Sequence, residues 1–477
     1  MALDETIAEN QAGHIADHEQ IATVLNDANL VVNEGWRRPE AYGPIGATDD
    51  AAPKIQQALT DVLAASDAGY TPGGVELGGR RYYIGSELSV VSGRTPIRGQ
   101  GGQSGATELF HHGAYRGALM SLESPRGGEA AITSTTFDRG ASQEGAAVSN
   151  IMFCGDRAMS GHASGLRTVG TCDSAWLKGL SFRYLNGTAL TLGDNAAAQN
   201  CGAVREGKLD WIEIRGCGNG DTYPTMLITI KATGTGDGTN QLSFQDFQAP
   251  YNYGPILIKN DHATETIRRI VFGGRTMLHG LAHAGVSDSE WDLLQIIGDV
   301  SSISIDNLIT NGSSGTNVAV PGTPDYAIIR TKASTVSAKY PSSLRIGWSQ
   351  WSTSYGDMIS VEKLNHLILE GWFSVSGGGW IGKSLRIASA SGLIDGDVLA
   401  LGIGGDISNF SFPDAATQRK ITMRTGNTLT TPNELGFYGA APIVKPAALP
   451  AASTDLPTAI ALANDLRTKL ISLGLLQ

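Results

Sequence analysis

The feature that most constrains the fold is a long succession of short segments in which apolar and polar residues alternate. Between about residues 145 and 426, apolar residues occupy every second position over three to five residues, and a turn rich in Gly, Asn, Asp or Ser follows. Examples are Leu180-Ser181-Phe182, Leu242-Ser243-Phe244 and Ile303-Ser304-Ile305. Because successive side chains of a strand point to opposite faces, each segment predicts a short strand with one buried face.

These strands recur at irregular intervals of 18 to 41 residues. The first strands of successive units begin at Leu180, Ile212, Leu242, Ile270, Ile303, Leu344, Leu367 and Leu385. Such recurrence is typical of a solenoid, in which strands stay in register while the loops between them vary in length. A β-sandwich is the alternative, but it favours tight hairpins between longer strands, whereas most gaps here span ten residues or more. We therefore predict an all-β chain folded as a right-handed parallel β-helix.

Composition agrees with this class and excludes others. Glycine contributes 61 of 477 residues and charged residues only 17%, which favours a turn-rich β protein. The net charge is −11 and no Lys/Arg block occurs, so we expect no nucleic-acid partner. No apolar run approaches the length of a membrane span, and acidic residues interrupt residues 1–25, so we expect neither membrane insertion nor a signal peptide. The expectation is a soluble protein assembled in a cytoplasm.

The cysteines and histidines predict neither a metal nor a cofactor. The four cysteines are spaced too widely for a metal-binding CxxC pair and are expected to be buried as small hydrophobes. They are Cys154, Cys172, Cys201 and Cys217. His14 and His18 are one helical turn apart but lack a third ligand nearby.

Residues 43–102 contain a series of motifs in a fixed order. The motifs are Gly46-Ala47-Thr48-Asp49-Asp50, Ile55-Gln56-Gln57-Ala58-Leu59, Gly73-Gly74-Val75, Tyr82-Tyr83-Ile84 and Ile97-Arg98-Gly99-Gln100-Gly101. In order and spacing this block resembles the N-terminal signature of the pectate-lyase-like β-helix superfamily found in phage tailspikes and polysaccharide enzymes. Ile55, Ala58, Leu59 and Val62 also form one apolar helix face. A helix there can cover the open end of the solenoid, with Asp49 or Asp50 as its cap and Pro53 in its first turn.

The two ends resemble a narrower group. Ala12-Gly13-His14-Ile15-Ala16-Asp17-His18 and Glu434-Leu435-Gly436-Phe437-Tyr438-Gly439 are similar to segments of minor tail proteins of phages of actinobacteria. The resemblance implies a virion protein carried on the tail, a homotrimer that contacts other tail proteins and the host surface. The predicted organisation is an attachment segment at 1–40, a cap with first coils at 41–147, the β-helix at 148–426, a Pro/Ala-rich linker at 427–456 and an oligomerisation helix at 457–477.

The last helix carries an apolar stripe without a local partner. The stripe consists of Ile460, Ala463, Leu466, Leu470 and Leu473, near a period of 3.5 residues. Threefold bundling with copies of the same helix would bury it. The alternative is that the helix docks on its own β-helix.

Two acids are candidates for catalysis. Enzymes of the superfamily that the chain resembles act on polysaccharides with a carboxylate pair or with basic residues. If the first strands are aligned on their buried residues, an outward column contains Arg183, Arg215, Gln245, Asp306 and Glu370. Asp306 and Glu370 then lie two coils apart, roughly 10 Å, at the wide end of the range for an inverting glycosidase. The simpler interpretation of both is solvated surface acids.

Five aromatic residues gather near these acids, within a stretch of 33 residues. They are Trp348, Trp351, Tyr355, Trp372 and Trp380. Aromatic faces stack on the apolar CH patches of sugar rings, so this stretch is the predicted glycan-binding region. The alternative is that these side chains fill the interface between three packed β-helices.

Two functional hypotheses follow. The first is a structural virion protein, a trimeric tail fibre or spike that contributes to host recognition by binding envelope glycans. The second is a tailspike depolymerase that hydrolyses or eliminates such a glycan. Attachment to the capsid, as a head fibre, is a further alternative to the tail.

Overall fold

The computed structural model describes most of the chain from residue 35 to residue 370 and shorter segments beyond it. The described residues are 35–68, 73–101, 106–123, 147–170, 172–173, 175–193, 203–230, 238–280, 292–311, 327–352, 357–370, 373–376, 385–387, 398–401, 410–411, 421–425, 428–430, 434–435, 443–444 and 456–472. Residues 1–34 of the predicted attachment segment (1–40) and residues 445–455 of the predicted linker (427–456) lie outside this set.

The described residues form two long sheets and a separate short antiparallel pair, and the long sheets are parallel except where β31 pairs antiparallel with β30 in sheet A. Sheet A comprises β1 (Trp36–Arg37), β2 (Gly74–Glu76), β3 (Arg81–Ile84), β5 (Ile97–Arg98), β6 (Thr107–His111), β8 (Val148–Ser149), β9 (Ile151–Cys154), β11 (Cys172–Asp173), β12 (Trp176–Arg183), β14 (Val204–Arg205), β15 (Lys208–Arg215), β17 (Asn240–Asn252), β19 (Ile267–Gly280), β21 (Val300–Asn311), β23 (Ser343–Ser352), β25 (His366–Glu370), β26 (Phe373–Ser376), β28 (Val398–Leu401), β30 (Ile421–Thr425) and β31 (Thr428–Thr430). Sheet B comprises β4 (Leu88–Val91), β7 (Ala118–Glu123), β10 (Ser164–Val169), β13 (Leu190–Leu192), β16 (Met226–Thr229), β18 (Ile256–Asn260), β20 (Leu294–Gly298), β22 (Ala327–Lys332), β24 (Asp357–Val361), β27 (Leu385–Ile387) and β29 (Phe410–Ser411). The antiparallel pair is β32 (Glu434–Leu435) with β33 (Ile443–Val444).

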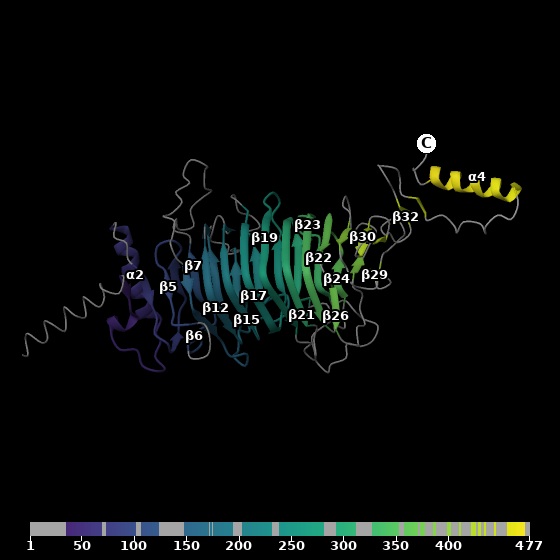
Figure 1. Ribbon diagram of the computed structural model, residues 1–477. Helices are drawn as coiled ribbons and strands as arrows, with labels where there is room; N and C mark the ends of the chain where they lie inside the picture. The colour runs from purple at the N-terminus through teal and green to yellow at the C-terminus, as the bar shows by residue number, and fades with distance from the viewer. Residues whose placement is uncertain are drawn as a thin grey trace, which may run out of the picture.

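The strands stack as the coils of one solenoid (Figure 1). In sheet B each strand pairs in parallel with the strand of the next coil, for example Leu190 with Met226 and Met226 with Ile256. Sheet A repeats the same pattern, with Phe244 opposite Phe272 and Phe272 opposite Ile305. The predicted right-handed parallel β-helix is confirmed, and we call one coil a rung.

Left-handed residues produce the corners of the rungs and stack on one another. The bend in the middle of the long sheet A strands is formed by Asn150, Gly179, Trp211, Asp246 and Gly274, with φ between 53° and 64°. At this bend the alternation of buried and exposed residues breaks, since Leu209 and Ile212 are both buried while the two residues between them are partly exposed. The bend divides sheet A into two facets.

The interior is a continuous stack of apolar side chains. Phe153 lies on Phe182 with ring centres 4.9 Å apart, and Phe244 lies on Phe272 at 4.6 Å. All four are buried in the single apolar cluster that also includes the cap helix. Because each inward residue contacts its equivalent one rung away, burial is shared between neighbouring coils, as in other solenoids.

The predicted cap is present at the N-terminal end, where α2 (Ala52–Asp67) lies beside the first coils (Figure 1). Ile55, Leu59 and Val62 are fully buried on its apolar face. The carboxylate of Asp50 accepts hydrogen bonds from the Ala52 N–H at 3.0 Å and the Gly85 N–H at 2.8 Å. Asp50 therefore joins the start of the helix to the turn after β3. The helix is preceded by η1 (Pro39–Tyr42).

At the other end, α4 (Leu456–Ser472) is drawn apart from the β-helix in Figure 1. Ile460 and Leu466 are 55% and 43% exposed, and Ala463 is exposed too. The side chains of Leu470 and Leu473 lie outside the described residues. No helix among the described residues is long and apolar enough to span a membrane.

Three of the four cysteines are described, and all three are free and buried, as predicted. Burial raises the pKa of both Cys154 and Cys217 to about 12. Cys201 lies outside the described residues.

The predicted outward column is wrong at one step. Arg183 does lie opposite Arg215, but Gln245 lies opposite Asp210 and not beside Arg215. The cause is the bend, because the alternating segment used for the alignment follows the bend at Leu180 and Ile212 but precedes it at Leu242, so two different facets of sheet A were aligned. Leu385, taken as a first strand, belongs to sheet B, and Leu367 pairs with Val398 instead.

Candidate functional site

Asp306 and Glu370 lie on one outward column of sheet A, two rungs apart, as predicted. Ile305 pairs with Ile346, and Ile346 pairs with Leu369, so the next residue of each strand forms the series Asp306, Gly347, Glu370. Gly347 places no side chain between the two acids on the middle rung. A Cβ there would lie 2.5 Å from the Asp306 carbonyl oxygen, so a larger residue would clash.

A side chain absent from the predicted set fills this gap. The Arg345 guanidinium donates from Nη1 to Asp306 Oδ1 at 2.9 Å and from Nε to Glu370 Oε2 at 2.8 Å. It also donates to the Ser304 hydroxyl at 3.0 Å. The hydrogen bond with Glu370 is the largest cause that holds the pKa of Arg345 above its usual value. One arginine thus joins acids from the rungs on either side of it.

This arrangement favours an ion-pair clamp over a hydrolytic pair. Each carboxylate binds the same guanidinium through one oxygen, Oδ1 of Asp306 and Oε2 of Glu370, as expected of an ion-pair cluster that ties three strands together. The side chains of Asp306 and Glu370 are 43% and 37% exposed, so the clamp is accessible to solvent and to a ligand.

Trp348 is the described member of the predicted aromatic group. It directly follows Gly347, pairs with Asn307 across the sheet, and is 43% exposed. Trp351 lies in β23 opposite Thr310, but its side chain is outside the described residues, as are Tyr355, Trp372 and Trp380. We call Ser304, Asp306, Arg345, Trp348 and Glu370 the bend surface, a mixed patch with one exposed aromatic face beside a charged cluster.

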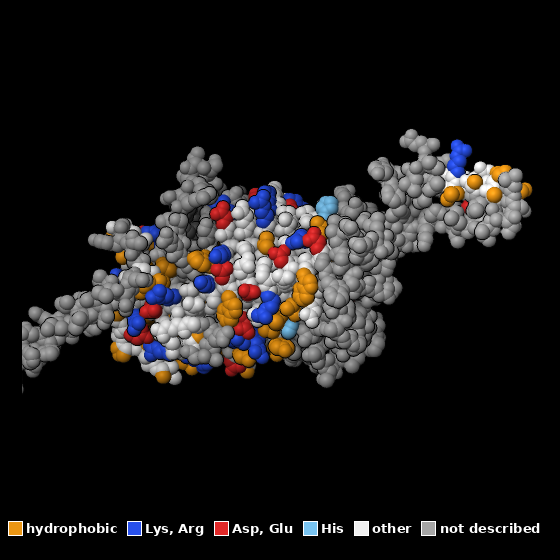
Figure 2. Space-filling model, viewed as in Figure 1, with side chains coloured by type: hydrophobic (Ala, Val, Ile, Leu, Met, Phe, Trp, Pro, Cys, Tyr) orange, Lys and Arg blue, Asp and Glu red, His pale blue; other side chains and the backbone are white. Residues whose placement is uncertain are grey.

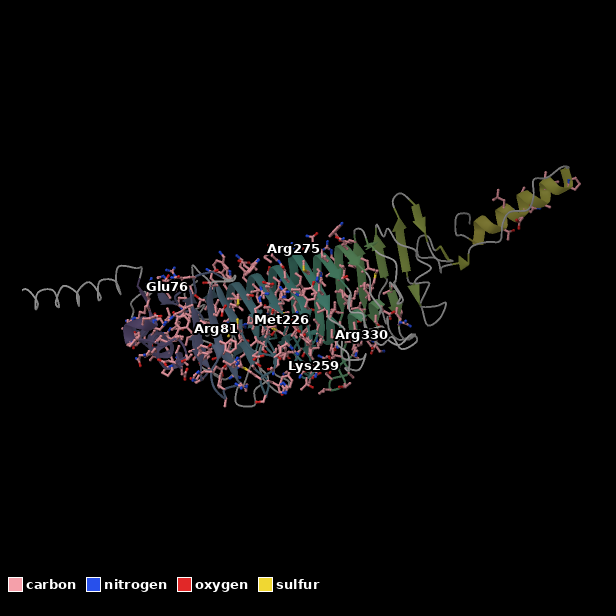
Figure 3. All side chains as sticks on the ribbon, turned by 90° about the horizontal axis from the view of Figure 1, so that it is seen from below. Glu76, Arg81, Met226, Lys259, Arg275 and Arg330 are labelled. Carbon is pink, nitrogen blue, oxygen red and sulfur yellow. The ribbon has the colours of Figure 1, made fainter. Side chains whose placement is uncertain are left out.

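Ion pairs between rungs recur elsewhere on the molecule. Arg183 contacts Glu213 of the next strand at 2.7 Å. Figure 2 shows positive and negative side chains lying next to one another along the visible face. In Figure 3, Arg275 of sheet A lies on the side of the β-helix opposite Lys259 and Arg330 of sheet B. Among the described residues, no three His, Cys, Asp or Glu side chains are grouped to hold a metal ion.

Sequence analysis missed a buried charged cluster on sheet B. Arg330 donates from Nε to Asp292 at 2.7 Å and from Nη1 to Glu362 at 3.1 Å. The Asp292 and Arg330 side chains are only 1% and 9% exposed, and burial raises the pKa of Asp292 to about 6 despite the arginine. Asp357 and Arg386 form a similar pair two rungs further on. The signal in the sequence is Arg330 itself, which directly follows the apolar segment Ala327-Ile328-Ile329.

No protein-family profile matches the chain, and no curated protein matches its sequence. Among solved structures, ORF18 of Geobacillus virus E2 superposes with a TM-score of 0.50 at 12% identity, over 77% of this chain and 62% of that protein. The chain thus spans about 62% of the length of that viral protein. PfbA, a surface adhesin of Streptococcus pneumoniae, gives a TM-score of 0.49 at 11% identity, over 81% and 88%. Tailspike protein 3 of bacteriophage CBA120 gives 0.32 at 10%, over 83% and 62%. At 12% identity the similarity to the viral protein shows a shared fold alone.

Proposed function

We propose that the chain is a structural protein of a bacteriophage virion, a trimeric tail fibre or spike of the minor tail protein class that helps to recognise the host surface. The observation that carries the proposal is the stack of parallel rungs through the described residues, capped by α2 at one end and followed by a helix with exposed apolar residues. A stack of this kind is a rigid rod. The resemblance of residues 43–102 to the tailspike signature supports it, and a viral protein shares the fold.

The final helix supplies the trimer. Ile460, Ala463 and Leu466 expose apolar surface that water disfavours, and a helix of 17 residues gains little stability alone. Three copies bundled in parallel bury this stripe and hold three rods together.

The bend surface supplies the contact with the host. Trp348 offers an exposed aromatic face for a sugar ring, and the clamp beside it offers donors and acceptors for hydroxyl groups. Because Arg345 pairs with both carboxylates, binding without cleavage is the activity that the geometry favours.

The test of the assembly is the mass of the full chain by light scattering. We expect about 150 kDa, three times 50.0 kDa. The double variant Ile460→Asp/Leu466→Asp adds two charges to the stripe and should give about 50 kDa. The matched variant Ala461→Asp/Thr468→Asp adds the same charge to the opposite helix face and should remain a trimer. A 50 kDa wild-type chain would refute the trimer.

A second experiment tests whether the protein cleaves the glycan or only binds it. The purified trimer is incubated with host envelope polysaccharide, and bound protein and new reducing ends are both measured. We expect binding without new reducing ends, and weaker binding by Trp348→Ala. Reducing ends that appear with the wild type and vanish in Asp306→Ala and Glu370→Ala would establish the depolymerase instead.

A further inference from the structure

Two exposed tyrosines stand on a second corner of the rungs, remote in sequence from the bend surface. Tyr184 and Tyr251 are 51% and 38% exposed, and each has a left-handed backbone, with φ of 56° and 57°. Tyr184 directly follows β12, and Tyr251 lies near the end of β17. Together with Gly216, Arg215 and His279 they form what we call the tyrosine strip.

The strip follows the axis of the β-helix. Arg183 pairs with Arg215, and the Tyr184 N–H donates to the Arg215 carbonyl at 3.1 Å, so Tyr184 lies beside Gly216. A Cβ on Gly216 would lie 2.8 Å from Cδ1 of Tyr184, which shows that the tyrosine ring covers the glycine. The alignment of β15 with β17 places Tyr251 one rung beyond Gly216. The two tyrosines are therefore two rungs apart, roughly 10 Å along the axis.

The backbone conformation of the tyrosines calls for an explanation. A left-handed conformation at a bulky residue costs roughly 1–2 kcal/mol, whereas glycine adopts it freely and does so at the intervening Gly216. The same backbone conformation recurs at other corners of the rungs, so the feature that points to a ligand is the pair of exposed rings and not the strain itself. Here the strain holds two large rings at the outer edge of the corner.

Positive charge accompanies the rings. The Arg215 guanidinium lies 5.4 Å from the centre of the Tyr251 ring, and the His279 ring meets that tyrosine edge-on at 5.9 Å. The Arg157 guanidinium lies 3.4 Å from the centre of the Tyr253 ring. It also donates hydrogen bonds to the carbonyls of Gly216 and Gly218. Within the described part of the chain neither Arg157 nor Arg215 forms an ion pair with a carboxylate, although the net charge is −11. A guanidinium that has no carboxylate partner in the protein can pair with a carboxylate or phosphate group of a ligand.

We propose that the tyrosine strip binds a glycan chain that carries acidic groups and lies parallel to the β-helix axis. Sugar faces stack on Tyr184 and Tyr251, and the acidic groups pair with Arg215 and Arg157. The inference rests on the proposed function, because it gives the rod a second contact with the host surface and names the class of polysaccharide.

The experiment is affinity electrophoresis of the full chain through native gels that contain either polygalacturonate, an acidic polysaccharide, or dextran, a neutral one. We expect polygalacturonate to retard the wild type more than dextran does. Tyr184→Asn/Tyr251→Asn keeps a residue that tolerates the left-handed backbone and should weaken binding roughly tenfold to a hundredfold. Arg215→Gln should reduce the retardation by polygalacturonate only.

Controls separate this inference from the proposed function. Val336→Ala alters an exposed apolar side chain outside both surfaces and should leave retardation by polygalacturonate unchanged. Equal retardation by both polysaccharides, or unaltered binding by the tyrosine variant, overturns the inference while leaving a trimeric mass intact. A tyrosine variant that loses its trimeric mass also overturns it, because the rings then face another copy of the chain. An absence of retardation in the wild type overturns it as well.

Discussion

At the scale of single residues, the most telling positions are those with a left-handed backbone. The described part contains ten non-glycine residues with positive φ, and nine of them lie on three stacked columns. One column is the bend, one is the tyrosine strip, and the third contains Glu206, Gln241, Arg269 and Ser302. Asn and Asp are enriched at positive φ, whereas Trp, Tyr, Gln and Arg are not. Most of these corners therefore cannot be predicted from the sequence.

A glycine at such a corner should stabilise the protein. Gln241 is exposed with φ 54°, and Gly in its place removes a strain of roughly 1–2 kcal/mol while adding roughly 0.5–1 kcal/mol of unfolded-state entropy. We expect Gln241→Gly to unfold at an equal or higher guanidinium concentration than the wild type. Gln245→Gly, on the same strand and equally exposed but extended, should unfold at a lower one. If both variants lower the free energy of unfolding equally, the left-handed backbone at Gln241 carries no strain.

At the scale of strands and their pairing, sequence analysis predicted the elements better than their alignment. The alternating segments and the cap helix are where they were expected, because burial on one face imposes a period of two on strands and of 3.6 on helices. The alignment of β15 with β17 was predicted wrongly, with Ile212 opposite Leu242 instead of Phe247, because the alternating segment follows the bend in β15 and precedes it in β17. Asp306 and Glu370 were aligned correctly since both come after the same buried position, but nothing in their spacing revealed that Arg345 lies between them.

Two arginines that join acids across strands should differ sharply in importance. Arg330 is buried against Asp292, whereas Arg345 is 41% exposed. We expect Arg330→Met to lower the free energy of unfolding by roughly 3–5 kcal/mol at pH 8, because it leaves a charged carboxylate buried alone. Arg345→Met should cost roughly 0–1 kcal/mol. Chemical denaturation of both variants provides the measurement.

The pH dependence supplies a further check. The pKa of Asp292 is about 6 in the fold and about 4 in the unfolded chain, so its favourable contribution is complete below pH 4 and is lost as pH rises through 6. Without Arg330 the pKa of Asp292 rises further, and the cost of Arg330→Met should be smaller at pH 5 than at pH 8. A cost that does not change with pH would show that Asp292 is not the group responsible.

At the scale of the whole molecule, the β-helix has one apolar interior and an end that must be covered. The α2 helix meets this need, since its buried face continues the interior stack past the first strands. Terminal caps of this kind protect a solenoid from pairing end to end.

Damage to the cap should therefore appear as association of rods. We expect Ile55→Asp, which places a charge at a fully buried position, to detach α2 and shift the protein to large aggregates in size-exclusion chromatography while the far-ultraviolet β signal persists. Thr60→Asp adds the same charge on the exposed side of α2 and should elute as the wild type does. If both variants aggregate, the added charge on α2 causes the aggregation and the loss of the cap does not.

The stacked corners have a consequence for how such a rod changes over generations. Leu209 and Phe244 occupy equivalent places on successive rungs, so a segment that starts at one and stops just before the other is a complete, self-consistent module. Gaining or losing such a module moves the distal tip by one fixed increment, roughly 4.8 Å, without disturbing anything on either side of the join. The length of the β-helix can thus change in steps of one rung while α2 and the C-terminal segments stay the same.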